Sequence, residues 1–298
     1  MINFTNCNIN KYKYYGGTNG NKICIIYNNE DYMLKLPYLK KEKTSYSNSC
    51  ISEYISCQII KTLGLNVQET ILGTFKDKIG VACKDFTGNG YVLKQFAELK
   101  NSQIETSENG YGTELNEVIE TIDNQTVFDQ KELKNFFWDM FIVDALLGNF
   151  DRHNGNWGFL VNAELKDIKI APIFDCGSCL YPQPNDEMLK SILNDEKEMN
   201  SRVFVFPTSA LKENNKKINY FDYISSLQNE DCNQALKRIF PRIDLKKINT
   251  IITETPFISD IRKQFYQEII KLRYEKILKY SYDKLIESWY LSKNVIFY

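Results

Sequence analysis

The stretch NFDRHNGNWGFLVNAELKDIKIAPIFDCGS, residues 149–178, carries the residues on which the prediction of fold and function depends. It holds a carboxylate, Asp151, an amide five positions later, Asn156, and a second carboxylate, Asp175, at the end of an apolar run. Any one of them alone is more simply explained as a turn residue or a strand end. Their order and spacing favour a common site.

Two apolar runs inside this stretch predict strands at 157–161 and 168–174, joined by a polar turn. Such a hairpin brings Asn156 and Asp175 together at one end. Phosphoryl transfer requires a group that orients the attacking hydroxyl, and oxygen ligands that fix Mg²⁺ against the phosphates of ATP. We therefore predict Asp151 as the catalytic residue that orients the hydroxyl, and the other two as catalytic metal ligands.

Residues nearer the start of the chain predict the rest of an ATP site. Gly16, Gly17 and Gly20 form a glycine-rich turn before a predicted strand, where exposed backbone N–H groups can approach phosphates. Lys35 lies on the next predicted strand and Glu53 on the helix that follows, a pairing that holds a lysine against the α- and β-phosphates. Each feature is weak alone, but the order turn, Lys, Glu, Asp/Asn, Asp is the one expected of kinases.

The hydrophobic pattern predicts an α+β fold of two lobes. The first, residues 1–86, is β-rich: its predicted elements are a hairpin of 23–27 and 32–36, a helix over 51–63, and strands over 69–75 and 78–84. The second, residues 87–298, is predicted to be mostly helical outside 150–180, with its clearest helices over 133–147 and 261–272. We place the boundary in the Gly- and Asn-rich turn at 85–90.

The composition is that of an ordinary soluble globule, with 43% hydrophobic and 25% charged residues among 298. The formal net charge of −1 supplies no general basic field, so we expect no direct nucleic-acid binding. No run reaches the roughly 20 apolar residues of a membrane-spanning helix. No signal peptide is visible, so we expect a cytoplasmic protein with reduced cysteines, while secretion as an effector stays open.

Five blocks of the sequence resemble the HipA-like kinases, over most of the chain from about Tyr15 onward. The blocks are YGGTNGNK, YMLKLP with Lys35, SEYISCQIIKTLGLNV with Glu53, GNFDRHNGNWGF with Asp151 and Asn156, and APIFDCGS with Asp175. The resemblance implies a bacterial serine/threonine protein kinase with a bilobal protein-kinase-like fold, ATP and Mg²⁺ as cofactors, and an unidentified protein substrate. It also implies that a linker from Val81 to Phe86 faces the adenine, which makes Asp85 and Phe86 cofactor-binding residues.

The chain differs from toxin-type HipA proteins in lacking the subdomain that precedes their kinase core, so pairing with a DNA-binding antitoxin is not implied. It is more similar to short, free-standing HipA-like kinases, which implies an effector or signalling role. The Asp-Arg-His-x-x-Asn order of Asp151 to Asn156 is also similar to the catalytic loop of phosphoinositide kinases, so lipid phosphorylation is an alternative. A pseudokinase or nucleotide-binding regulatory module shares the fold, but the presence of all the key residues argues against it.

Three further features have simpler interpretations. His153, the only histidine, is expected to pack or hydrogen-bond within the catalytic loop rather than act as a base. Cys176 and Cys179 form a CxxC with no second pair, which favours accidental spacing over a zinc site, with redox control as an alternative. An exposed loop over the cleft is predicted to be autophosphorylated, and comprises Lys40, Lys41, Lys43, Ser45, Ser47 and Ser49.

Overall fold

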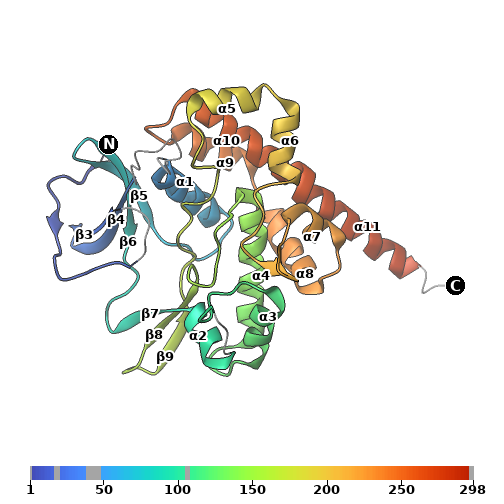
Figure 1. Ribbon diagram of the computed structural model, residues 1–298, viewed down its shortest axis with the longest axis horizontal. Coiled ribbons are helices and arrows are strands. Elements are labelled where there is room, and N and C mark those ends of the chain that lie inside the picture. The colour runs from blue at the N-terminus through green and yellow to red at the C-terminus, as the bar shows by residue number, and fades with distance from the viewer. Residues whose placement is uncertain (1, 17–20, 38–47, 105–107, 295–298) are drawn as a thin grey trace.

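The computed structural model describes residues 2–16, 21–37, 48–104 and 108–294. A six-stranded sheet lies at one end of the molecule, helices form the other, and a three-stranded sheet lies beside them (Figure 1). Helix α1 (Ser49–Thr62) packs on the six-stranded sheet, and helix α4 (Gln130–Leu147) runs through the middle of the helical part (Figure 1). The predicted α+β fold is confirmed.

The six-stranded sheet is built mainly from hairpins. Its strand order is β1-β5-β6-β4-β3-β2, with β1 parallel to β5 and the other neighbours antiparallel. The strands are β1 (Ile2–Asn3), β2 (Asn8–Ile9), β3 (Asn21–Tyr27), β4 (Glu30–Leu36), β5 (Thr70–Phe75) and β6 (Lys78–Lys84). The turns at 28–29 and 76–77 have positive φ at both residues, as two-residue hairpin turns require.

Alternation along the strands gives this sheet two apolar faces. Leu34 and Ala82 point to one face, where they pack with Phe4. Val81 points to the other face, in the core shared with α1, and Lys35 is its partner in the β4–β6 register. Because partners in register share a face, this alternation points Lys35 toward α1.

The second part of the chain is mostly helical. Its helices are α2 (Phe96–Gln103), α3 (Leu115–Asn124), α4, α5 (Asp186–Leu193), α6 (Glu196–Phe204), α7 (Tyr220–Ser226), α8 (Glu230–Ile239), η1 (Phe240–Arg242), α9 (Leu245–Glu254), α10 (Asp260–Arg273), the π-helical η2 (Tyr274–Lys279) and α11 (Tyr280–Asn294). Its strands are β7 (Tyr91–Gln95), β8 (Gly158–Asn162) and β9 (Asp167–Ile170), with a separate hairpin of β10 (Lys212–Glu213) and β11 (Lys216–Lys217).

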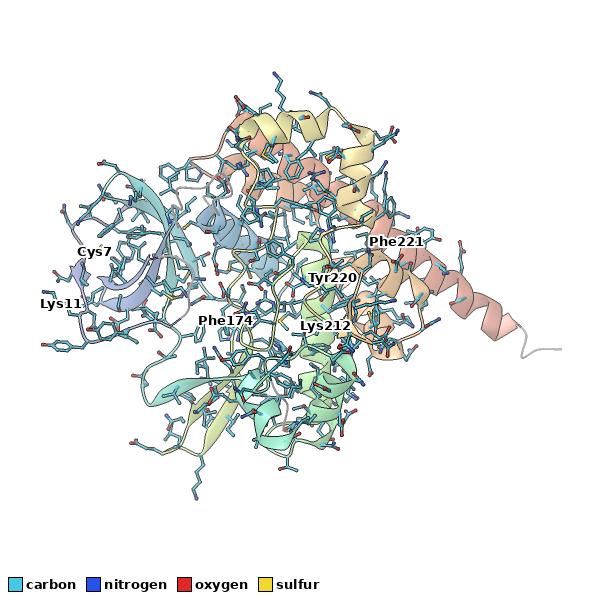
Figure 2. All side chains as sticks on the ribbon, viewed as in Figure 1. Cys7, Lys11, Phe174, Lys212, Tyr220 and Phe221 are labelled. Atoms are coloured by element: carbon cyan, nitrogen blue, oxygen red, sulfur yellow. The ribbon has the colours of Figure 1, made fainter. Side chains whose placement is uncertain are left out.

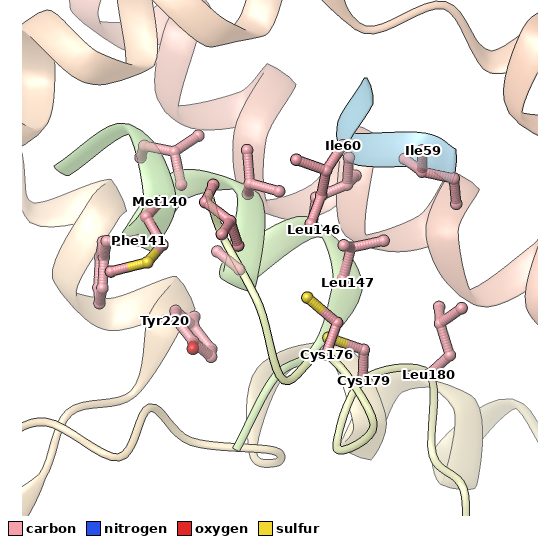
Figure 3. Packing of buried hydrophobic residues seen from close by; sticks show 14 of the residues in the cluster. Ile59, Ile60, Met140, Phe141, Leu146, Leu147, Cys176, Cys179, Leu180 and Tyr220 are labelled. Carbon is pink, nitrogen blue, oxygen red and sulfur yellow. The ribbon is translucent and has the colours of Figure 1, made fainter. Parts of the chain in front are cut away.

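Helix α4 is the centre of the main hydrophobic core. Asp129 caps its first turn by accepting from Glu132 N at 2.7 Å, and Gly148, at φ 65°, ends it where a left-handed residue is needed. Leu146 and Leu147 lie at its end beside Ile60 of α1 (Figure 3). One continuous core therefore joins α1, which packs on the sheet, to the helical part.

The structure differs from two of the predicted elements and narrows the expected linker. The second strand of the 157–174 hairpin ends at Ile170, because Pro172 lacks a backbone donor and Ile173 N donates instead to Asn66 O at 2.8 Å. Strand β7 lies in a region predicted to be helical, since its short run is stabilised by pairing with β8. Residues 81–84 belong to β6, so only Asp85 and Phe86 of the expected linker leave the sheet.

Within the described ranges, no helix is long and apolar enough to cross a membrane.

Truncation of a core residue at the end of α4 tests this packing. We expect Leu146→Ala to lower the free energy of unfolding by about 2–5 kcal/mol, because Leu146 is fully buried and its removal leaves a cavity. The exposed Lys131→Ala on the same helix should change it by less than about 0.5 kcal/mol. Urea unfolding of the two variants measures the difference, and equal stabilities would contradict the assigned core.

Candidate active site

The predicted site residues meet in one cavity of about 780 Å³ between the six-stranded sheet and the segments that follow α4. Phe174, which lines it, is labelled between the two parts of the molecule in Figure 2. Its lining includes Gly16, Lys35, Glu53, Asp85, Phe86, Asp151, Asn156 and Asp175. Gly17 and Gly20, and most of the predicted autophosphorylated loop, lie outside the described residues.

Lys35 joins two carboxylates that come from different segments of the chain. Its Nζ lies 2.8 Å from Glu53 Oε2 on α1 and 2.9 Å from Asp175 Oδ1. Burial alone would lower the pKa of Lys35, but Asp175 and Glu53 raise it well above the usual lysine value, so the ammonium stays charged. In turn Lys35 lowers the pKa of Asp175 to about 2. Lys35 and Asp175 are therefore both ionised at neutral pH.

Glu53 makes a second contact that fixes the segment carrying Asp175. Its Oε1 accepts from Cys176 N at 3.1 Å, so one buried carboxylate binds both Lys35 and the backbone after Asp175. Asp175 itself has φ 57°, in the left-handed region, which costs energy for a non-glycine residue. A side chain on Gly177 would lie 3.1 Å from Glu53 Oε2, so this turn leaves little space.

The loop from Asn149 to Asn156 is held by hydrogen bonds within itself. Asp151 N donates to Asn149 Oδ1 at 3.0 Å, and Asp151 O accepts from His153 N and from Asn156 Nδ2, both at 2.8 Å. His153 Nδ1 accepts from Gly155 N at 3.0 Å, which fits its expected role inside the loop. The loop therefore presents the Asp151 carboxylate and the Asn156 side chain to one cavity without needing a ligand to order them.

Asp151 is half-buried at the cavity wall. Burial raises the pKa of its carboxyl above the ordinary value, and the negative charge of Asp175 adds to this effect against the opposing charges of His153 and Arg152. A carboxylate with a raised pKa is a better proton acceptor than an ordinary aspartate.

Arg152, which the sequence analysis did not single out, holds together the segments that form the site. Its guanidinium binds the buried Asp144 of α4, with Nε 3.0 Å from Oδ2. It also donates to Asn156 O at 2.9 Å and to Phe174 O. One buried side chain therefore joins α4, the loop of Asp151 and the segment of Asp175. The sequence did contain a signal for this contact: Asp144 interrupts the apolar run of α4, and a buried carboxylate requires a charged partner such as Arg152.

Two other cations line the cavity and were also missed. Lys22 Nζ donates to Gly16 O at 2.9 Å, which places an ammonium at the glycine-rich turn. Lys13 Nζ lies 2.7 Å from Asp85 Oδ2, so the Asp85 carboxylate is occupied by the chain itself. Phe86 lies beyond it, and among the described residues neither its backbone N–H nor its C=O has a hydrogen-bond partner.

The side chains of Asn156 and Asp175 fit the hard oxygen donors that Mg²⁺ prefers. Asn156 uses its Nδ2 on Asp151 O, which leaves Oδ1 toward the cavity, and Asp175 uses Oδ1 on Lys35, which leaves Oδ2. The described part of the chain contains no cluster of three or more His, Cys, Asp or Glu side chains arranged for a metal. Two protein ligands are what a magnesium ion shared with nucleotide phosphates requires.

The CxxC cysteines belong to the core rather than to the cavity wall. All eight cysteines are free, and Cys176 and Cys179 are buried next to Leu147 and Leu180 (Figure 3). Cys176 Sγ accepts from Arg152 Nη2 at 3.5 Å, so its thiol is part of the contacts beneath the site.

The fold and this site together define the class of protein. A sheet lysine paired with a helix glutamate faces a loop with Asp and Asn and a further Asp, the set of groups that kinases use. The chain is an enzyme of the kinase class. It belongs to the HipA-like C-terminal domain family, whose model matches residues 16–246.

Known proteins similar to this chain agree with that assignment. It is 55% identical over 267 residues to the serine/threonine-protein kinase CtkA of Helicobacter pylori, covering 89% of this chain and 82% of the relative. The crystal structure of the H. pylori proinflammatory kinase CtkA matches with a TM-score of 0.93 at 52% identity, covering 96% of this chain and 98% of that one.

A more distant structure shares the fold alone. In the complex of the Shewanella oneidensis toxin–antitoxin proteins HipA and HipB with operator DNA, the matched chain has a TM-score of 0.58 at 14% identity. The match covers 93% of this chain and 69% of that one.

Replacement of Arg152 tests its structural role. We expect Arg152→Met to lower the free energy of unfolding by about 3–5 kcal/mol, because it leaves the Asp144 charge buried without its partner. Arg242→Met removes an exposed arginine with one long hydrogen bond of 3.4 Å and should cost less than about 1 kcal/mol. Denaturant unfolding monitored by circular dichroism measures both, and a stable Arg152 variant would contradict the assignment.

Proposed function

We propose that this chain transfers the γ-phosphate of ATP to serine or threonine hydroxyls of a protein, with Mg²⁺ as the metal. The observation that carries the proposal is the placing of Lys35, Asp151, Asn156 and Asp175 on one cavity. The similarity to a serine/threonine-protein kinase over most of the chain supports the choice of protein hydroxyl over lipid.

ATP would bind with its phosphates toward Lys35 and the glycine-rich turn. Lys35 is held by Glu53 and stays charged, which suits the α- and β-phosphates, and Lys22 adds a second ammonium nearby. The unpaired backbone groups of Phe86 suit the hydrogen-bonding edge of adenine. Asp85 would act on the nucleotide only through the backbone, since its carboxylate binds Lys13.

Asn156 and Asp175 would hold Mg²⁺, which neutralises charge that develops on the phosphates. Asp151 would accept the proton of the substrate hydroxyl and orient its oxygen for in-line attack on the γ-phosphorus. The backbone hydrogen bonds to Asp151 and the Arg152 contacts keep these side chains in place during the reaction.

We also propose that the chain has two lobes, residues 1–86 and 87–298, with ATP in the cleft that they share. A further proposal is that the loop ending at Ser49 is autophosphorylated. Ser49 lines the cavity at the start of α1, which supports access of this loop to the phosphate. A bacterial, cytoplasmic protein fits the relatives' source and the sequence.

The test of transfer uses ATP labelled at the γ-phosphate, Mg²⁺, and a panel of proteins and lipid vesicles. Wild type should label protein, including itself, and Asp151→Asn should reduce the rate by about 10²–10⁴-fold because the proton acceptor is lost. Asp175→Asn should also lose transfer. Lys131→Ala, on the exposed side of α4, should leave the rate unchanged.

Three outcomes would contradict the proposal. Label confined to lipid would assign a lipid kinase. No label with intact ATP binding would assign a nucleotide-binding module without transfer, and full activity of Asp151→Asn would remove Asp151 as the proton acceptor.

The rate should also depend on pH through Asp151. Only the ionised carboxylate accepts a proton, and its pKa is raised, so kcat/KM should fall on acidification at a pH above the ordinary aspartate value of about 3.9. Asp175, with a pKa of about 2, stays ionised throughout this range. Measurement from about pH 4 to pH 8, with ATP binding followed in parallel, checks this. A constant rate down to about pH 4 in folded enzyme would disprove it.

A further inference from the structure

A tight hairpin presents two lysines opposite each other near the catalytic loop. Its turn, residues 214–215, has φ angles of 53° and 63°, as a two-residue type I′ turn requires. The backbone register places Lys212 opposite Lys217, and Glu213 opposite Lys216. Opposite residues share a face of the hairpin, so Lys216 faces a carboxylate, whereas Lys212 and Lys217 face each other.

The hydrogen-bond pattern brings this lysine pair close together. Ile218 N donates to Leu211 O at 2.9 Å, so the next pair toward the turn, Lys212 and Lys217, is a non-hydrogen-bonded pair. Side chains approach most closely at such pairs, and like charges there destabilise a hairpin. Among the residues that the structure describes, neither lysine has an ion-pair partner. The hairpin register thus holds the two lysines opposite each other, and no carboxylate among the described residues pairs with either of them.

One side of the hairpin is fixed to the segment that supports the catalytic loop. Thr113 O accepts from Lys212 N at 2.8 Å. The preceding Gly112 O accepts from the buried Asn154 Nδ2 of the loop at 2.7 Å. Glu114, the next residue, directs its carboxylate to the hairpin turn, where Oε1 accepts from a backbone N–H at 2.9 Å, and it forms no ion pair with the lysines.

The other side of the hairpin is fixed to the start of the same loop. Tyr220, three residues after Lys217, donates its hydroxyl to Asn149 O at 2.7 Å. Figure 2 labels Lys212 and Tyr220 in the centre of the view. The hairpin is therefore held from both sides to the loop that carries Asp151, the residue proposed to orient the acceptor hydroxyl.

We propose that Lys212 and Lys217 bind acidic side chains of the protein substrate next to the hydroxyl that receives the phosphate. Neither lysine lines the nucleotide cavity, so their charge is left for a ligand outside it. The occupant is a peptide segment carrying Asp or Glu, chosen by charge complementarity to the fixed lysine pair. This specificity rests on the proposed kinase function.

The test measures peptide binding and phosphate transfer separately, with the full chain. Two fluorescent peptides have a central serine flanked by Glu in one and by Gln in the other. Fluorescence anisotropy should show tighter binding of the Glu peptide, and the double variant Lys212→Ala/Lys217→Ala should weaken that binding by about three- to tenfold. Lys216→Ala, which removes a lysine from the other face of the same hairpin, should keep the preference. Added salt should reduce the preference of the wild type for the Glu peptide.

Each outcome decides the proposal. Equal binding of the two peptides by wild type, or a Glu preference that survives in the double variant, would overturn it. Transfer measured in the same samples reports the kinase function independently, so an inactive protein that still prefers the Glu peptide would contradict only that function. Lys217→Gln, a single exposed change, gives the same comparison if the double variant unfolds.

Discussion

The buried ion pair between Arg152 and Asp144 is the contact on which the arrangement of the residues at the cavity depends. A charged pair inside a core is costly to desolvate, and here the cost is offset by further hydrogen bonds from the same guanidinium. These bonds reach Asn156 O and Phe174 O, which lie on two segments that are separated in the sequence. The ion pair thus sets the relative position of the Asp151 loop and the Asp175 segment.

A second charged group joins the sheet to this assembly. Lys35 lies between Glu53 and Asp175, and Glu53 also accepts from the backbone of Cys176. The position of α1 is therefore tied to these charges. Movement of α1 away from the Asp175 segment would break the bond from Cys176 N to Glu53 and disturb the contacts of Lys35. Lys35 is consequently held and charged within the cavity by contacts of the chain itself. Outside the cavity, the lysine pair of the β10–β11 hairpin is the charged feature that we propose to bind the protein substrate.

Local patterns in the sequence were enough to predict much of this. Hairpins β3–β4 and β5–β6 followed from alternating apolar residues and polar turns, and α1 and α4 from helical periodicity ended by Gly64 and Gly148. The order of Lys35, Glu53, Asp151, Asn156 and Asp175 predicted that they would share a site, and all five line one cavity. The predictions of these strands and helices were confirmed because strand alternation, helical periodicity and turn chemistry act over a few residues.

Other features depended on contacts that no local pattern encodes. The early end of β9 and the strand β7 each require a partner far away in the chain, at Asn66 and β8 respectively. The role of Arg152 depends on its bond to Phe174 O, 22 residues away. The opposition of Lys212 and Lys217 depends on hairpin register, and the attachment of the hairpin to the loop of Asp151 depends on Thr113 and Tyr220. The sequence by itself determined which chemical groups the site contains. Only the tertiary structure decided how they are held, because burial and long-range hydrogen bonding exist only once the segments pack.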